Sequence, residues 1–313
     1  MERVVDISTD GLHLAVHRGF LVVSKDHQET GRIALDDIGA VIAHAHGLTW
    51  SNNLFVQLAE RSVPVVICSS NHAPVTCLWP LAGHYMQGAR MRAQANAAKP
   101  LKKQLWQKIV MAKITMQGLV LESTGAEAGA FSLLARKVRS GDPDNVEAQA
   151  ARRYWQALMG PDFRRDSNSG DLNALLNYGY TVLRAVISRA ICSAGLHPTL
   201  GIFHSNRANA FALADDLMEP YRPLVDRMVR NMADMGKAHV DAEAKRQLAG
   251  IATLDLDTNE GVSPLSVQAG RFVYSVASAF ETGNITLDLP RAPSKMALAM
   301  LGRNEAVLEK NQE

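Results

Sequence analysis

The sequence has few cysteines, and their positions exclude the two structures that cysteines usually build. The chain of 313 residues contains Cys68, Cys77 and Cys192, an odd and scattered set without a CxxC pair. Neither a disulfide framework nor a cysteine-ligated zinc site is therefore supported. Cys68 and Cys192 lie in apolar runs, where cysteine usually acts as a small core residue.

Acidic residues are missing from one long stretch of a chain whose charges otherwise nearly balance. No Asp or Glu occurs from Arg61 to Leu121, although the whole chain carries 33 Lys and Arg against 31 Asp and Glu. Such a block predicts a positive surface for a polyanion, but a solvated basic helix face explains the charge equally well. The basic residues of the block are Arg61, Arg90, Arg92, Lys99, Lys102, Lys103, Lys108 and Lys113.

Long apolar runs are absent as well. No run approaches the roughly 20 apolar residues that a membrane-spanning helix needs, and the N-terminus lacks the basic and apolar segments of a signal peptide. We therefore expect a cytoplasmic protein without a membrane partner. An apolar fraction of 47% is ordinary for a soluble globular chain.

The residues that are present divide the chain into two parts. Up to residue 80, short runs rich in Val, Ile and Leu predict strands, with hairpin turns at Asp10-Gly11 and Arg18-Gly19 and one helix over 49–61. Beyond Trp79-Pro80, apolar residues at helical spacing continue almost to the C-terminus. The expected fold class is α+β, with a small N-terminal β domain at 1–80, a linker at 81–88 and a larger all-α domain at 89–313.

The stretch 201–223 contains one histidine, His204, followed by several carboxylates that are interleaved with apolar residues. A carboxylate beside apolar packing is costly unless a cation neutralises it, and a divalent metal, Arg207 or Arg222 would do so. One straight helix would place His204 and Glu219 about 22 Å apart, so a shared site requires a break. Ser205-Asn206 is the predicted break and cap for a new helix that starts at Arg207.

Two further segments carry polar residues that allow either a structural or a functional interpretation. Asp144 and Glu147 match a capping box at the start of a helix, which would explain Glu147 without any chemistry. Asn177, Tyr178 and Tyr180 lie in a strongly helical run, where they either are satisfied locally or line a ligand site.

Four segments together resemble the CRISPR adaptation integrase family, Cas1, in both their order and their spacing. The resemblance covers almost the whole chain and is nearest to the type II branch. The segments are Asp144–Trp155, Asn173–Arg184, Ala194–His204 and Phe211–Pro223.

This resemblance implies that Glu147, His204 and Glu219 are catalytic and bind a divalent metal, Mg²⁺ or Mn²⁺. Asp216 occupies an additional acidic position of the family. Oxygen ligands with one imidazole suit these ions. The implied activity is that of a metal-dependent DNA endonuclease and strand transferase, in which a prespacer 3′ hydroxyl attacks a phosphodiester of the CRISPR repeat.

The implied partners are double-stranded DNA (the prespacer and the repeat), a second copy bound through the 1–80 domain, and the small protein Cas2. Further adaptation and effector proteins of the type II branch are also candidate partners. A phosphodiesterase for small substrates and a DNA-binding scaffold with a structural His and acid cluster are the alternatives. The candidate DNA-binding residues are Arg90, Arg92, Lys102, Lys108, Lys113, Asn177, Tyr178, Tyr180, Arg207 and Arg222.

Overall fold

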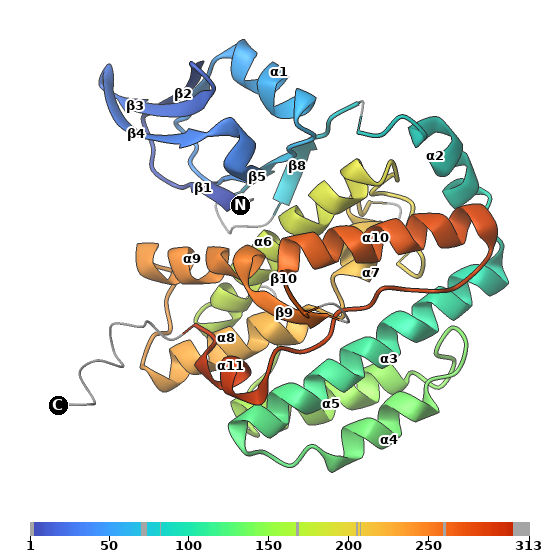
Figure 1. The fold of residues 1–313 in the computed structure, drawn as a ribbon. Coiled ribbons are helices and arrows are strands. Elements are labelled where there is room, and N and C mark those ends of the chain that lie inside the picture. Colours follow the sequence, from blue (N-terminus) through green and yellow to red (C-terminus); the bar gives the residue numbers. More distant parts are fainter. Residues whose placement is uncertain are drawn as a thin grey trace.

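The computed structural model describes residues 3–69, 74–81, 83–166, 169–204, 206, 208–258 and 261–302. Strands gather in the N-terminal part and helices make up most of the remainder (Figure 1), which confirms the predicted α+β class. In these ranges no helix combines the length and the apolar composition needed to cross a membrane.

The N-terminal strands form two four-stranded sheets, with orders β4-β3-β2-β6 and β1-β5-β7-β8. Arg18-Gly19 joins antiparallel β2 and β3 as predicted, whereas the Asp10-Gly11 hairpin was wrong because β1 and β2 belong to different sheets. The predicted helix over 49–61 is shorter, since 49–50 pair with β2 as a strand. The elements are β1 (Arg3–Ile7), β2 (Leu12–His17), β3 (Phe20–Lys25), β4 (Gln28–Ala34), β5 (Ile38–Ala43), β6 (Thr49–Trp50), α1 (Asn52–Glu60), β7 (Val65–Cys68) and β8 (Pro74–Leu78).

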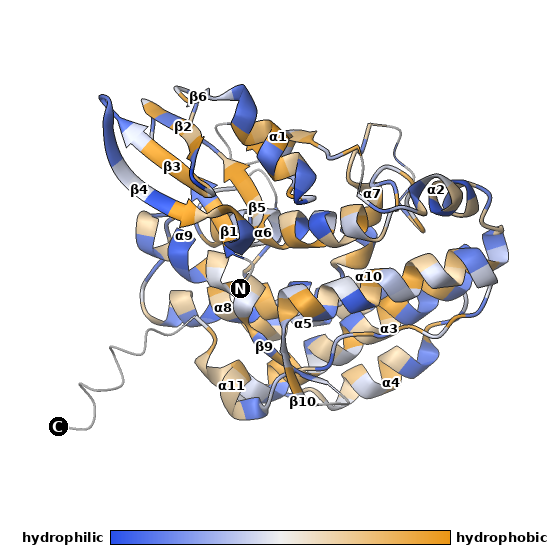
Figure 2. Ribbon diagram, turned by 45° about the horizontal axis from the view of Figure 1, so that its top comes forward, coloured by the Kyte–Doolittle hydropathy of each residue, from blue (hydrophilic) through white to orange (hydrophobic). Residues whose placement is uncertain are grey.

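Strand β5 separates two hydrophobic cores because all of its residues are buried. Since side chains alternate along a strand, Val41 packs with Leu14 and Leu54 in the core between the sheets and α1, whereas Ala40 and Ile42 join the core of the helical body. The edge strand β4 is largely exposed and hydrophilic, as Figure 2 shows. A polar edge discourages pairing with other chains.

The helical body is built around α6, which contacts β5, α8, α9 and α10 (Figure 1). Gly179 permits the close packing of α6 on α8, because a Cβ there would lie 2.5 Å from Cγ1 of Val225. The helices are α2 (Gln87–Ala95), α3 (Lys99–Thr124), α4 (Gly129–Lys137), α5 (Val146–Met159), α6 (Leu172–Ser193), α7 (Ala212–Leu217), α8 (Arg222–Asp234), α9 (Ala242–Ala249), α10 (Leu265–Thr282) and α11 (Lys295–Met300).

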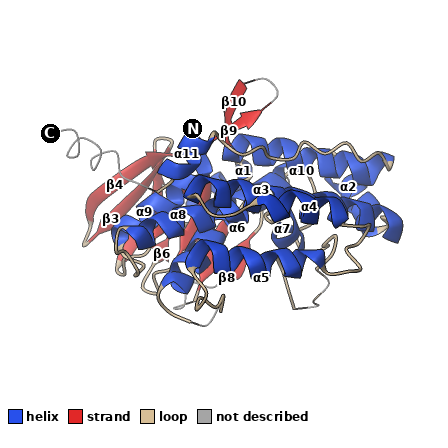
Figure 3. Cartoon of the chain, turned by 90° about the horizontal axis from the view of Figure 1, so that it is seen from below, coloured by secondary structure: helices blue, strands red, loops and turns tan. Residues whose placement is uncertain are grey.

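The C-terminal part is not entirely helical, so that detail of the expected fold was wrong. Strands β9 (Asp255–Thr258) and β10 (Gly261–Pro264) pair in an antiparallel hairpin. Figure 3 shows this hairpin projecting from the helices, apart from the N-terminal strands. The division at 1–80, 81–88 and 89–313 stays a prediction; β8 ends at Leu78 and α2 begins at Gln87.

A buried polar cluster joins the N-terminal sheet to α6. Asp6 on β1 accepts a hydrogen bond from the hydroxyl of Tyr178 on α6 and lies 3.4 Å from Nε2 of His44. The ammonium of Lys245 lies 5.7 Å from the centre of the Tyr178 ring. Burial alone would raise the pKa of Asp6, but the bonds from His44 and Tyr178 outweigh it and lower that pKa. An ionised carboxylate therefore fastens the sheet to the helical body.

Replacing Tyr178 with Phe removes this fastening without changing the volume of the side chain. We expect the free energy of unfolding to fall by about 1–3 kcal/mol, because the buried Asp6 loses a donor. Urea titration measures the loss, and Tyr85→Phe is the matched control, since Tyr85 is 92% exposed. Equal stability of the two variants would show that the Tyr178–Asp6 bond does not stabilise the fold.

Candidate active site

Glu147 is positioned by a tight turn that precedes α5. The carboxylate of Asp142 accepts hydrogen bonds from the backbone N–H groups of Val146, at 2.9 Å, and of Glu147, at 3.0 Å. The predicted capping box was wrong, because Asp144 pairs with Arg139 instead. Asp142 therefore caps the helix, which leaves the side chain of Glu147 free for another partner.

The loop at 201–204 is folded around the buried carboxylate of Asp216. Asp216 accepts from the backbone N–H of Ile202 at 2.6 Å, of Phe203 at 2.9 Å and of His204 at 3.2 Å. Gly201 makes this approach possible, because a Cβ there would lie 2.3 Å from the His204 carbonyl oxygen and 3.0 Å from Asp216. The additional acidic residue thus organises the loop that carries the histidine.

The imidazole of His204 is held by two kinds of contact. Its Nδ1 lies 2.5 Å from Oδ1 of Asp216, and its ring meets Trp106 of α3 edge-on at 5.8 Å. Phe203 stacks on the same indole at 4.3 Å with nearly parallel planes. With Nδ1–H donated to Asp216, Nε2 is left as the acceptor that could ligate a metal.

Glu219 lies beyond a break in the chain rather than on one long helix with His204. The expectation that 201–223 is not one straight helix is confirmed, but the new helix starts at Ala212 rather than at Arg207. It ends at Leu217, and Pro220 separates it from α8. This short element turns the buried Glu219 towards α3.

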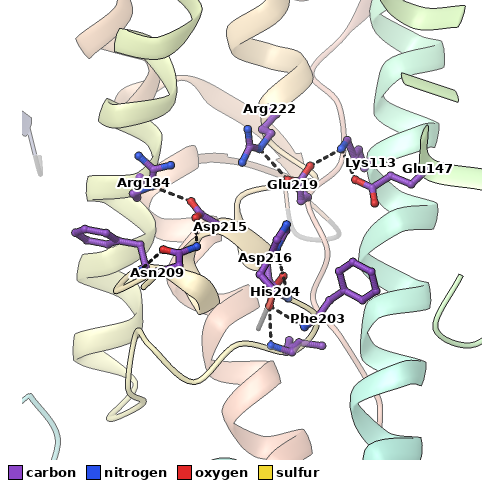
Figure 4. Close-up of polar contacts among 12 residues, drawn as sticks. Lys113, Glu147, Arg184, Phe203, His204, Asn209, Asp215, Asp216, Glu219 and Arg222 are labelled. Atoms are coloured by element: carbon purple, nitrogen blue, oxygen red, sulfur yellow. Dashed lines mark hydrogen bonds and ion pairs between the residues drawn. The ribbon is translucent and has the colours of Figure 1, made fainter. Parts of the chain in front are cut away.

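Glu147 and Glu219 converge on one ammonium group (Figure 4). The Nζ of Lys113 on α3 lies 2.6 Å from Oε1 of Glu147 and 2.5 Å from Oε2 of Glu219. Arg222 places its Nε 3.0 Å from the other oxygen of Glu219. Three segments that are distant in the sequence therefore meet at two carboxylates and two cations.

The charges around this centre support one another. Burial opposes ionisation of Glu219, but Arg222 and Lys113 lower its pKa below the ordinary value. Burial likewise opposes the charged form of Lys113, yet the two glutamates raise its pKa. The hydrogen bond to Asp216 raises the pKa of His204. Glu219 and Lys113 are therefore held in their charged forms.

The donor set fits a hard divalent cation. Two carboxylates already share one positive charge, and an imidazole oriented by a carboxylate lies on the neighbouring loop (Figure 4). Within the part of the chain that the structure describes, no three His, Cys, Asp or Glu side chains are close enough to ligate one ion as they stand. Lys113 occupies the space between the glutamates and would have to shift if both of them were to hold a metal.

Three of the candidate DNA-binding residues are buried. Arg90 donates to the carboxylate of Glu281 and to a backbone carbonyl, and the hydroxyl of Tyr180 donates to Asp226 at 2.5 Å. Tyr178 belongs to the cluster that fastens the sheet to α6. These three side chains are engaged inside the protein rather than presented on a surface.

The other candidates differ in their accessibility. Arg92 and Lys108 are exposed on α2 and α3, Lys102 and Asn177 are half-buried, and Arg207 lies outside the described residues. The two remaining candidates are the cations beside the glutamates, on α3 and α8. The basic block at 61–121 thus supplies one residue of the centre as well as exposed charge.

Several residues of the site were not identified from the sequence. Asp142 and Trp106 position the glutamate and the histidine, and Lys113 was expected to contact DNA rather than the two carboxylates. Arg165, in the loop after α5, was not among the candidates, although it binds two side-chain amides of α6. The Gly141-Asp142 pair before a helix was a usable capping signal.

Comparison with known families shows which proteins this chain resembles. Residues 5–253 match the family model of CRISPR associated protein Cas1. A curated relative, the CRISPR-associated endonuclease Cas1 of Neisseria meningitidis serogroup C (strain 8013), is 39% identical over 278 residues, which cover 88% of this chain and 90% of that protein.

Solved structures share the fold at lower identity. A casposase bound to its integration product superposes with a TM-score of 0.77 at 21% identity and covers 91% of this chain and 92% of the casposase. A chain of a Cas6-RT-Cas1–Cas2 complex gives a TM-score of 0.72 at 20% identity, covering 90% of this chain and 35% of that one. At these identities the comparison establishes the fold alone.

The buried Asp226 behind the site gives a pH-dependent prediction. Burial raises its pKa to about 7 from an ordinary value of 3.8, despite bonds from Tyr180 and Tyr154 and the charge of Arg222. Between about pH 4 and pH 7 the folded protein keeps a proton that the unfolded chain releases, so a rising pH reduces the free energy of unfolding. Asp226→Asn does not titrate and should gain stability relative to the wild type across this window.

Urea titration of both proteins at several pH values measures this difference. A difference that stays constant with pH would mean that Asp226 is ionised throughout in the folded protein.

Proposed function

Because the chain belongs to the Cas1 family, we propose that it is a CRISPR adaptation integrase, a metal-dependent DNA endonuclease and strand transferase. It inserts short duplex DNA into the CRISPR repeat by attack of a prespacer 3′ hydroxyl on a repeat phosphodiester. The 39% identity to a Neisseria Cas1 over most of both chains supports its placement in the type II branch.

One observation carries this proposal: Glu147, on α5, and Glu219, in the turn before α8, share a single cationic position beside a histidine that Asp216 orients. Carboxylate pairs of this kind hold divalent ions in enzymes that act on phosphodiesters. We assign Glu147, Glu219 and Nε2 of His204 as the ligands of Mg²⁺ or Mn²⁺. When bound, such an ion polarises the scissile phosphate and activates the attacking hydroxyl.

The protein's own groups prepare the reaction. Asp216 holds the His204 ring in one orientation and fastens its loop by three backbone hydrogen bonds. Arg222 and Lys113 keep Glu219 ionised, so the ligand needs no deprotonation before it binds a metal. No side chain has to act as a covalent nucleophile, since the prespacer hydroxyl is itself the nucleophile.

The proposed partners follow from the family. The casposase of the same fold is bound to an integration product, and another chain of this fold is part of a Cas1–Cas2 complex. We propose double-stranded DNA and Cas2 as partners of this protein, together with a second copy bound through the N-terminal sheets. The exposed charges of Arg92 and Lys108 suit contacts with DNA phosphates.

The two alternatives have less support. A phosphodiesterase for small substrates needs one or two cations, whereas the acid-free block supplies exposed cations beyond the centre. A structural His and acid cluster would be expected to satisfy its own members. Here the glutamates instead form ion pairs with Lys113 and Arg222. The side chain of His204, which carries Nε2, is 40% exposed.

His204→Ala tests the metal assignment. We expect strand transfer of a prespacer into a repeat-bearing plasmid, measured with Cas2 and Mn²⁺, to fall by at least about 100-fold because one ligand is lost. Duplex binding, measured at low and moderate salt, should keep its wild-type affinity and salt dependence. His197→Ala is the control from the same region, and EDTA gives the metal-free baseline. Undiminished integration by the variant would refute the assignment.

Lys113→Met tests whether a cation is required between the glutamates. Without added metal we expect the free energy of unfolding to fall by about 3 kcal/mol, because Glu219 keeps only one of its buried partners. Added Mn²⁺ should restore stability to the variant by more than it stabilises the wild type. Lys108→Met, an exposed change on the same helix, should behave like the wild type. A stabilising effect of Mn²⁺ that is the same in all three proteins would exclude a metal between the glutamates.

A further inference from the structure

A small cavity of about 120 Å³ lies directly beside the glutamates. Helices α3, α5, α6 and α8 and the loop after α5 enclose it. Lys113 and Arg222, the two cations in contact with Glu219, form part of its wall. Its other polar and aromatic walls are Gln117, Trp155, Arg165, Tyr180 and Asp226.

Arg165 brings to this cavity a positive charge that no acid offsets. Its guanidinium donates to Oδ1 of Asn173 at 3.0 Å and to Oδ1 of Asn177 at 2.6 Å, and it lies 5.4 Å from the centre of the Tyr180 ring. Among the described residues, no carboxylate lies within ion-pair distance of it, whereas Lys113 is paired with two glutamates. Neutral amides hold the guanidinium in place but leave its charge available for an anion.

Gln117 adds an unsatisfied polar group on the α3 side. Its side chain is buried, with the residue 2% exposed, and its Oε1 has no hydrogen-bond partner. A buried amide oxygen normally has a partner, so one that faces a cavity marks a position for a ligand group. Because the two ends of an amide can exchange by rotation, Gln117 can accept from a hydroxyl or donate to a phosphate oxygen.

The remaining walls favour a nucleotide over a bare ion. Trp155 and Tyr180 line the cavity with aromatic rings, which are surfaces against which sugars and bases pack. Asp226, the acid of the wall, is bonded to Tyr180 at 2.5 Å, and burial raises its pKa to about 7. Below neutral pH this acid is therefore mostly protonated and does not repel an incoming phosphate.

We propose that this cavity is a subsite for one phosphodiester group of the reacting DNA strand, with Arg165 contacting the phosphate and Gln117 bonding to the same nucleotide. This inference rests on the proposed function, since the neighbouring glutamates then hold the metal. The subsite holds a linkage next to the strand end and thereby fixes how far that end reaches into the reaction centre.

The test compares the affinities of the wild type and its variants for unmodified and modified DNA probes. The measurements are made in EDTA, so that binding is observed without strand transfer. The probes are short duplexes with a labelled 3′ overhang, each carrying one neutral methylphosphonate at a different linkage near the 3′ end. For the unmodified probe we expect Arg165→Gln to weaken binding roughly tenfold, as loss of a charged hydrogen bond does, and to reduce the salt slope by about one. Arg164→Gln, the same change at the exposed neighbour, should leave both values unchanged.

The same comparison then identifies the linkage. At one linkage, the methylphosphonate should weaken wild-type binding by about the same factor as the Arg165→Gln change does, and it should not weaken the binding of Arg165→Gln any further. At the other linkages, it should weaken the binding of both proteins equally. Gln117→Leu should reduce affinity for probes that carry the nucleotide of that linkage and not for probes shortened to lack it. Arg165→Lys should recover part of the affinity, because it restores the charge without the planar fork.

Other outcomes overturn the subsite. If Arg165→Gln weakens all probes equally and lowers the melting temperature, Arg165 only holds its loop on α6. If inorganic phosphate raises the melting temperature of the wild type and not of Arg165→Gln while no linkage is coupled, the cavity binds a free anion rather than the DNA strand. Coupling at one linkage together with absent strand transfer would refute the proposed function and leave the subsite standing.

Discussion

The need to neutralise two carboxylates inside a helical body is the constraint on which the site depends. Glu219 is buried and Glu147 is largely covered, and both pair with Lys113. An unpaired charge in such a place is strongly destabilising, so the elements that carry these three residues must remain in register. The Asp142 cap at the start of α5 and the break at Pro220 before α8 are the local features that keep the carboxylates directed at one point.

A second buried carboxylate organises the part of the site that has no regular structure. Asp216 accepts hydrogen bonds from the backbone N–H groups of 202–204 and lies against the ring of His204. These N–H groups are available because residues 202–204 are not helical, whereas N–H groups inside a helix are already bonded. Gly201 gives the space, and the stacking of Phe203 on Trp106 attaches the loop to α3. The same helix thus carries both the cation for the glutamates and the aromatic support for the histidine.

The basic residues of the chain have two different roles. Some are structural, as Arg90 is, because their charges are spent on buried partners. Others have no acidic partner among the described residues: Arg92 and Lys108 on the surface, and Arg165 in the cavity beside the glutamates. The location of each charge relative to acids, rather than the total of +2, decides which of them can attract DNA.

The sequence by itself determined the fold class, the change from strands to helices along most of the chain, and the residues of the candidate site. Spacing along the chain reports local structure, so the change from strands to helices near residue 80 and the break between His204 and Glu219 could be predicted. The four family-like segments also identified Glu147, His204 and Glu219 as candidates, although no contact between them was visible.

Only the tertiary structure decided which groups meet. Lys113 and Glu147 are 34 positions apart and Asp6 and Tyr178 are 172 apart, and no local pattern encodes such contacts, because they arise from the packing of whole helices and sheets. The capping box at Asp144 was misleading for a different, local reason: Asp144 pairs with Arg139, and Asp142 accepts from the N–H groups at the start of the helix. Whether a basic residue serves the core, the glutamates or the DNA depends on its surroundings in space, which the chain defines only once it is folded.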